Sequence, residues 1–207
     1  MGKIIHRFTR KKLAGLLTIV MVWLLTCGFY YTLPDGTYFD ADFYRTTYTE
    51  LSGTDTELMN QYWFYGIQEG KLPYAGANDV SAASVLNYIN LYRTENGLTE
   101  LSLDTDLQEK AQARARELAD NHYFAHYRPS DGSKWNTIYG IWQNTYIRLG
   151  ENLARGQTSS FQVVERWKTS TGHNAIMLHT GVDIAGVGVA KDINGHFYFV
   201  LHVGLRK

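Results

Sequence analysis

The chain has 207 residues, with 20 basic and 20 acidic residues and a single cysteine. This length allows one hydrophobic core of ordinary size with some additional chain, and the hydrophobic content of 44% excludes a chain that is disordered throughout. One cysteine excludes an internal disulfide, so the stability of the fold must come from packing.

The first 31 residues predict a membrane anchor. Residues 1–12 carry five basic residues and no acidic residue, and residues 13–31 contain no charge. An uncharged run of this length can span a bilayer, and the basic flank predicts that residues 1–12 are cytoplasmic and that the rest of the chain is exported. We therefore expect a single-pass protein of the cell membrane whose C-terminal part is extracellular.

Two other fates of this segment remain open. It could be a cleaved signal peptide, which would give a secreted protein, or a lipoprotein signal in which Cys27 is acylated. The run is longer than the apolar core of a usual signal peptide, and Thr26 is large for the residue before a lipidated cysteine, so we favour the anchor. Beyond residue 12 the chain has 15 basic and 20 acidic residues. We therefore expect no nucleic-acid partner.

Residues 39–73 predict a small helical module. Phe43, Tyr44, Tyr48 and Leu51 fit one short helix, Gly53 ends it, and Thr54 with Glu57 forms a capping box for a second helix. The segment resembles a short helical unit that accompanies domains in secreted bacterial proteins. A unit this small should need a neighbour to pack against, so a spacer or adaptor role is favoured over catalysis.

Three helices are expected in residues 82–205. The first begins at Ala82 and stops at Gly97, and the second begins near Thr105, where Gln108 completes a capping box. The third runs from Ser160 to about Thr169. The stripe of the second helix is rich in alanine, which permits close packing against a sheet or another helix; it consists of Leu107, Ala111, Ala115, Leu118 and His122.

The hydrophobic period then changes to two. The segments "VDIAGVGVAKD" and "HFYFVLHVG" flank an Asn194-Gly195 turn and predict a β-hairpin. Helices followed by strands indicate an α+β fold in which helices pack on an antiparallel sheet.

Four motifs in order resemble the CAP superfamily in its bacterial branch. They are the long stretch from "LNYINLYRTENGL" to "NHYFAHYRP", then "GENLARG", "WKTSTGHNAIML" and "IAGVGVA". The superfamily includes cysteine-rich secretory proteins, antigen 5 and pathogenesis-related 1 proteins. The resemblance covers about residues 82–205 and implies an α–β–α sandwich with a central cleft.

The resemblance also implies which residues meet in that cleft. The histidine of the family's F-x-H stretch falls on His126, the glutamate of GEN on Glu151, and the histidine that follows glycine on His173. Many eukaryotic members have a second glutamate at the position of Ser170. We expect Asn152 and Ser170 to be cleft residues beside these three.

Two imidazoles and a carboxylate suit a divalent metal such as zinc. His126 and His173 are the predicted metal ligands, and Glu151 either orients a histidine or holds a metal-bound water as a catalytic base. The alternative is a buried hydrogen-bonded cluster with a structural role only. A His122 and His126 pair on one helix face could also chelate a metal, although we favour His122 as a packed core histidine. We expect His179, His196 and His202 to be structural.

Two functions follow from these predictions. The favoured one is a membrane-tethered extracellular binding module whose cleft, rimmed by the "GENLARG" loop, takes a metal ion and a small ligand, lipid or peptide. The alternative is a metal-dependent hydrolase acting on peptide or cell-envelope substrates, with Glu151 as general base. No G-x-S-x-G motif is present, and a Ser170 and His173 nucleophile pair is the least favoured reading.

Overall fold

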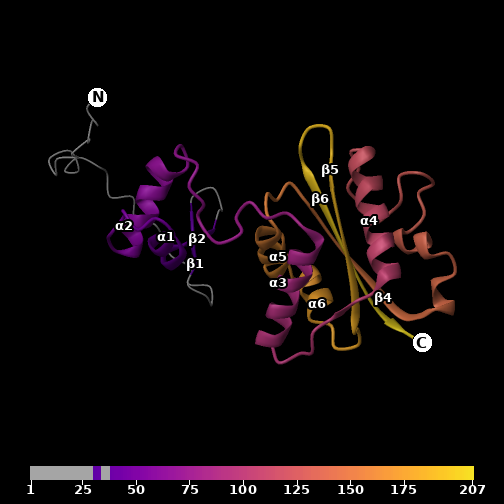
Figure 1. Ribbon diagram of the computed structural model, residues 1–207. Coiled ribbons are helices and arrows are strands. Elements are labelled where there is room, and N and C mark those ends of the chain that lie inside the picture. Colours follow the sequence, from indigo (N-terminus) through magenta and orange to yellow (C-terminus); the bar gives the residue numbers. More distant parts are fainter. Residues whose placement is uncertain (1–29, 34–37) are drawn as a thin grey trace.

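The computed structural model describes residues 30–33 and 38–207 (Figure 1). Residues 1–12, Cys27 and most of the predicted anchor lie outside the described residues. Tyr30 and Tyr31, the last two residues of the predicted anchor, belong to the strand β1 (Tyr30–Thr32), so its predicted end at Tyr31 is wrong. Within the described part of the chain, no helix has the length and apolar character needed to cross a membrane.

The predicted helical module is present and includes a hairpin before it. β1 pairs antiparallel with β2 (Tyr38–Asp40), and α1 (Ala41–Thr47) and α2 (Asp55–Gln61) follow. The capping box of Thr54 and Glu57 is confirmed at the start of α2. α2 continues into η2 (Tyr62–Gly66), a single π-helical turn.

The module has its own small core and also contacts the main domain. Its buried cluster consists of Leu33, Phe39, Ala41, Tyr44, Leu58, Met59 and Tyr62. The Tyr38 ring packs edge-on against Phe161 in α5 (Ser160–Lys168), with ring centroids 5.3 Å apart. In the connecting segment, the Tyr74 hydroxyl lies 2.5 Å from the Ser159 hydroxyl at the N-cap of α5. The module is thus joined to the main domain at the start of α5.

The first two predicted helices of the main domain are present, but the residue that caps the start of the second differs from the prediction. α3 (Ala82–Glu95) is followed by Gly97, whose φ of 72° suits the residue after a helix. α4 (Thr105–Asp120) is capped by Asp104, which accepts a hydrogen bond from the Leu107 amide. The capping box predicted from Thr105 and Gln108 is therefore wrong. Gln108 instead bonds the backbone N–H and C=O of Val187 in the sheet.

His122 does not continue the stripe of α4, contrary to the prediction. The helix ends at Asp120, and His122 has a φ of 49° with 47% of its side chain exposed. The Asn121 side chain donates to the Glu117 carbonyl and so satisfies a terminal acceptor of the helix. His122 is therefore not a core residue, and His122 and His126 do not share a helix face.

The main sheet has four strands in the order β3-β5-β6-β4. The predicted hairpin is confirmed as β5 (Ile184–Lys191) and β6 (Phe197–Arg206), and β4 (Tyr146–Arg155) pairs antiparallel with β6 at the sheet edge. The short β3 (Ser102–Leu103) runs parallel to β5, so the sheet is not wholly antiparallel. Most of "GENLARG", predicted as a loop, lies in β4.

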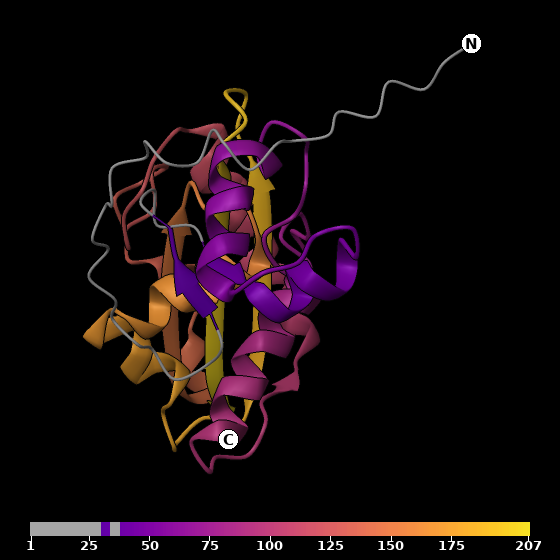
Figure 2. The same ribbon diagram turned by 90° about the vertical axis from the view of Figure 1, so that its left-hand side faces the viewer.

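Helices cover both faces of this sheet (Figures 1 and 2). α4 packs on β5 and β6 from one side, while α3, α5 and α6 (Thr171–Met177) lie on the other. Two hydrophobic clusters follow this division: one joins α4 to Leu153, Tyr198 and Val200, and the larger one lies beneath α3 and α5. The architecture is therefore the expected α–β–α sandwich. Two short 3-10 turns, η3 (Trp135–Tyr139) and η4 (Trp142–Asn144), lie between α4 and β4.

Glycines of β5 bring α4 unusually close to the sheet. A Cβ placed on Gly188 would lie 2.0 Å from the carbonyl oxygen of Ala111, and one on Gly186 would lie 2.2 Å from the Gln108 amide nitrogen. Both neighbours are backbone atoms of α4, which cannot move without shifting the helix. The prediction of close packing by the alanine-rich stripe is therefore confirmed.

We predict that Gly188→Ala destabilises the protein by about 3 kcal/mol, because the added methyl group must push α4 away from β5. Gly172→Ala is the matched control, since Gly172 lies in α6, where an added Cβ would have nothing within 4 Å. The measurement is chemical denaturation followed by circular dichroism. Equal transition midpoints for the two variants would contradict the close-packing account.

Candidate functional site

Glu151 lies in the interior, opposite His202. The two residues are directly paired in the register of β4 and β6, so their side chains share the face of the sheet that α4 covers. Glu151 is 3% exposed and His202 is fully buried. A carboxylate at this depth must be paired to remain ionised.

Three side chains contact the Glu151 carboxylate. Oε1 lies 2.8 Å from Nδ1 of His126, and Oε2 lies 3.2 Å from Nε2 of His202. Nε of Arg114, from α4, donates to Oε2 over 3.3 Å. Of the predicted residues, the structure therefore brings Glu151 and His126 together, and it adds Arg114 and His202.

Arg114 also holds the segment that carries His126. Its guanidinium is fully buried and donates to Glu117 Oε2 over 2.8 Å and to the carbonyl oxygens of Ala125 and Tyr127 over 2.5 and 2.9 Å. Sequence reasoning missed Arg114, although it lies three residues after Ala111 and hence on the buried face of α4. This arginine fixes the backbone on both sides of His126.

The Glu151 carboxylate is ionised at neutral pH. Burial alone would raise the pKa of Glu151, but the hydrogen bonds from His126 and His202 and the charge of Arg114 hold the pKa below its ordinary value. Burial lowers the pKa of His202, against the opposing effect of Glu151. His202 is therefore neutral, and an ionised carboxylate can only accept hydrogen bonds.

These charge states assign the protons of both imidazoles. The Tyr139 hydroxyl lies 2.7 Å from Nδ1 of His202, and burial raises the pKa of Tyr139, so the phenol stays protonated and donates to Nδ1. The His202 proton is then on Nε2 and points to Glu151. His126 likewise donates from Nδ1 to Glu151, since an ionised carboxylate only accepts hydrogen bonds. Nε2 of His126 takes no part in this bond, and the ring is 53% exposed.

His173 approaches from the other face of the sheet. It lies in α6, and its ring is 6.4 Å from that of the buried Trp167. Asn152, which follows Glu151 and points to the opposite face, donates from Nδ2 to the His173 carbonyl over 2.9 Å. Burial, followed by the charges of His126 and Arg166, lowers the pKa of His173. His126, bonded to Glu151, and His173, whose backbone is bonded to Asn152, thus lie on opposite sides of the edge strand β4.

A cleft of about 410 Å³ lies beside this strand. Ser170 and His173 line it, whereas Asn152 is buried and His126 is not among the lining residues. The lining residues are Phe124, Leu153, Ala154, Arg155, Gln157, Arg166, Trp167, Thr169, Ser170 and His173.

The described residues contain no group of three or more His, Cys, Asp or Glu side chains arranged to hold a metal ion. His126 and His173 would supply two imidazoles, with Glu151 bonded to the far nitrogen of His126, which is how carboxylates orient metal-binding histidines. The donor types therefore suit zinc, but two protein ligands leave the other positions to water.

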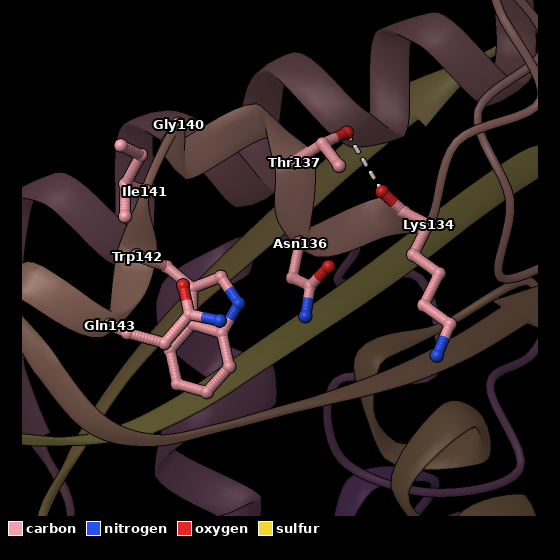
Figure 3. A pocket seen from close by; sticks show the side chains of 7 residues that line it. All are labelled: Lys134, Asn136, Thr137, Gly140, Ile141, Trp142 and Gln143. Carbon is pink, nitrogen blue, oxygen red and sulfur yellow. Dashed lines mark hydrogen bonds between the residues drawn. The ribbon is translucent and has the colours of Figure 1, made fainter.

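A second hollow, of about 490 Å³, lies over η3 and η4. Figure 3 shows the Thr137 hydroxyl bonded to the Lys134 carbonyl on one side of it and Trp142 with Gln143 on the other. Lys134 is its only ionisable lining residue, and none of the predicted site residues lines it. Of the predicted site residues, Ser170 and His173 line the cleft beside β4, and none lines this second hollow.

We predict that the protein loses stability as the pH falls below about 6.5, the ordinary pKa of histidine. His202 has a lowered pKa in the fold, so in this range the unfolded chain binds a proton that the folded chain does not. His202→Gln should remove this contribution, which is at most about 1.4 kcal/mol per pH unit for one proton. The measurement is the free energy of unfolding as a function of pH.

His196→Gln is the control for this experiment, because His196 lies beyond the turn after β5 with half of its side chain exposed. It should keep the pH slope of the unchanged chain. An identical slope in the His202 variant would mean that His202 is not neutral in the fold.

Comparison with known proteins agrees with this architecture. The family model described as "Cysteine-rich secretory protein family", or CAP, matches residues 86–203. A Bacillus subtilis (strain 168) protein named "Uncharacterized protein YkwD" is 34% identical over 109 residues, which are 52% of this chain and 41% of YkwD. The chain thus spans less than half the length of this relative.

Two solved structures share the fold. An extracellular protein containing a SCP domain from Bacillus anthracis str. Ames aligns with a TM-score of 0.54 and 21% identity over 60% of this chain and 40% of that one. An outer surface protein from Borrelia burgdorferi aligns with a TM-score of 0.54 and 24% identity over 59% of this chain and 90% of that one. Since the family model covers more than half of the 207 residues, the chain belongs to the CAP superfamily, in its bacterial branch.

Proposed function

We propose that the protein is an extracellular binding module, tethered to the membrane by the uncharged segment that begins at residue 13, whose cleft beside β4 holds a divalent ion and a small ligand. The observation that carries this proposal is the hydrogen bond from Nδ1 of His126 to the buried Glu151 carboxylate, 2.8 Å long. This bond orients the His126 ring and leaves its Nε2 atom unused by Glu151, in a ring that is half exposed.

The arrangement suits ligand binding because it is held in advance. Arg114 fixes the backbone around His126 through the carbonyls of Ala125 and Tyr127, and Asn152 fixes the backbone at His173. Neither imidazole would therefore lose much conformational entropy on binding. A divalent ion held by the two would supply a positive charge to an oxygen atom of the ligand.

The extracellular location is supported by the relatives and by the sequence. The Bacillus anthracis structure is described as extracellular and the Borrelia burgdorferi protein as an outer surface protein. The basic flank and the uncharged run before residue 32 have the order expected for an anchor with an exported C-terminal part.

The hydrolase alternative has less support. A general base needs an accessible carboxylate within reach of the attacking water. Glu151 is 3% exposed and already accepts hydrogen bonds from three side chains. Its geometry favours a positioning residue that acts through His126.

We predict one-to-one zinc binding by the full-length chain that is lost in the double variant His126→Ala, His173→Ala. Two imidazole ligands should give weak affinity, and loss of both removes every proposed protein ligand. The measurement is isothermal titration calorimetry, with folding checked by circular dichroism.

The double variant His122→Ala, His196→Ala is the matched control, because these two histidines lie near Asp192, away from the cleft, and are about half exposed. It should bind zinc as the unchanged chain does. Zinc binding that survives the cleft double variant, or that is absent from the unchanged chain, would overturn the metal site.

We also predict that Glu151→Gln lowers the free energy of unfolding by about 3 kcal/mol, because it removes a charge that compensates a buried arginine. Replacing both partners, with Glu151→Gln and Arg114→Met, should cost less than the sum of the single changes. Denaturant unfolding of the four proteins in this cycle measures the coupling. Additive losses would show that the buried pair does not act as a unit.

A further inference from the structure

The cleft beside β4 has a positive lining. Arg155 at the end of β4 and Arg166 in α5 both line it, and no aspartate or glutamate is among its lining residues. Glu151, the carboxylate of β4, points to the face that α4 covers, as Arg155 does, and is already paired with Arg114. An anionic ligand would therefore meet no opposing charge from the lining.

The guanidinium groups of the two arginines have no polar partner in the described part of the chain. Among residues 30–33 and 38–207, no ion pair or hydrogen bond involves the guanidinium of Arg155 or Arg166, and both residues are exposed. Arg155 lies over the Tyr198 ring at 5.4 Å, which orients the group without occupying its N–H donors. Arg114 and Arg206, by contrast, are bonded to carboxylates. The neighbouring Glu165 is held by Lys168 at 2.5 Å.

The same lining offers an acceptor and an apolar surface. The amide oxygen of Gln157 is buried without a hydrogen-bond partner, and the last torsion of a glutamine side chain is soft enough to turn that oxygen to a donor in the cleft. Phe124 is 47% exposed beside Leu153. The cleft thus combines two cations, one free acceptor and one aromatic surface.

We propose that the cleft binds the C-terminal end of a short peptide, with the terminal carboxylate on Arg155 and Arg166. The amide N–H of the last peptide bond would donate to Gln157, and the terminal side chain would lie against Phe124. Arginine is well suited to a planar carboxylate because its donors form a fork that matches the two oxygens. This proposal deepens the binding-module function and rests on it.

Inorganic phosphate is also an anion, and its P–OH group could donate to Gln157. It has no apolar group for Phe124. The cleft volume of about 410 Å³ is also within the range of small-molecule sites and much larger than one phosphate. A peptide end uses all three features of the lining.

The test is calorimetric titration of the full-length chain, freed of metal with a chelating resin, with N-acetyl-alanyl-leucine and with its C-terminal amide. We expect the free acid to bind and the amide to bind at least about tenfold more weakly, because the amide loses a charge-assisted pair. Arg155→Gln and Arg166→Gln should each weaken binding of the acid by about tenfold or more. Arg116→Gln, an exposed arginine of α4 outside the cleft, should leave it unchanged.

Equal affinity for acid and amide, unchanged affinity in both cleft arginine variants, or no binding of the acid would overturn the proposal. If phosphate binds with the same affinity as the free acid, and the arginine variants lose this binding, the cleft binds a simple anion and the peptide proposal is wrong. Zinc titration of Arg166→Gln separates this inference from the proposed function. Zinc binding without peptide binding would overturn the inference alone, and peptide binding without zinc binding would overturn the metal site alone.

Discussion

The buried pair of Arg114 and Glu151 connects the parts of the main domain from which the site is built. Arg114 belongs to α4 and Glu151 to the edge strand β4, and the same guanidinium binds the backbone on both sides of His126. The ion pair of Arg114 and Glu151 therefore links a helix, a strand and the irregular segment that carries His126. Two ions at this depth carry a large desolvation cost. It is offset because His126 and His202 donate hydrogen bonds to Glu151, and Arg114 donates another to Glu117.

This network also separates structural from functional histidines. His202 has both ring nitrogens engaged, one by Tyr139 and one by Glu151, and is fully buried, so it has no atom left for a ligand. His126 has one nitrogen engaged and half of its ring exposed. The Glu151 carboxylate thus pairs with the buried His202 on one side and orients the half-exposed His126 ring on the other. A purely structural role explains only the first of these contacts.

The sequence predicted the parts of the fold that depend on local patterns. The hairpin around Asn194-Gly195, the α3 helix and the Thr54 capping box are set by residues close together in the chain, and all three formed. Partnerships between distant residues were missed. The contact of His202 with Glu151 depends on the register of β4 with β6, and residue 151 was expected in a loop. Arg114 was missed because the stripe of α4 was followed only through its apolar residues, while Arg114 lies on the same buried face beside Ala111 and Ala115.

The position of β4 explains why the cleft can combine groups of different chemistry. Alternate residues of a strand point to opposite faces, so Glu151 joins the network beneath α4 while Asn152 reaches α6. Because β4 is the last strand of the sheet, no further strand separates the two faces at its outer edge. Arg155 follows at the end of the same strand, where α5 contributes Arg166. The oriented imidazole of His126 and the guanidinium groups of the two arginines therefore lie at one edge of the sheet. The fold uses the Glu151 carboxylate that orients the imidazole. It leaves the two guanidinium groups without an ionic partner.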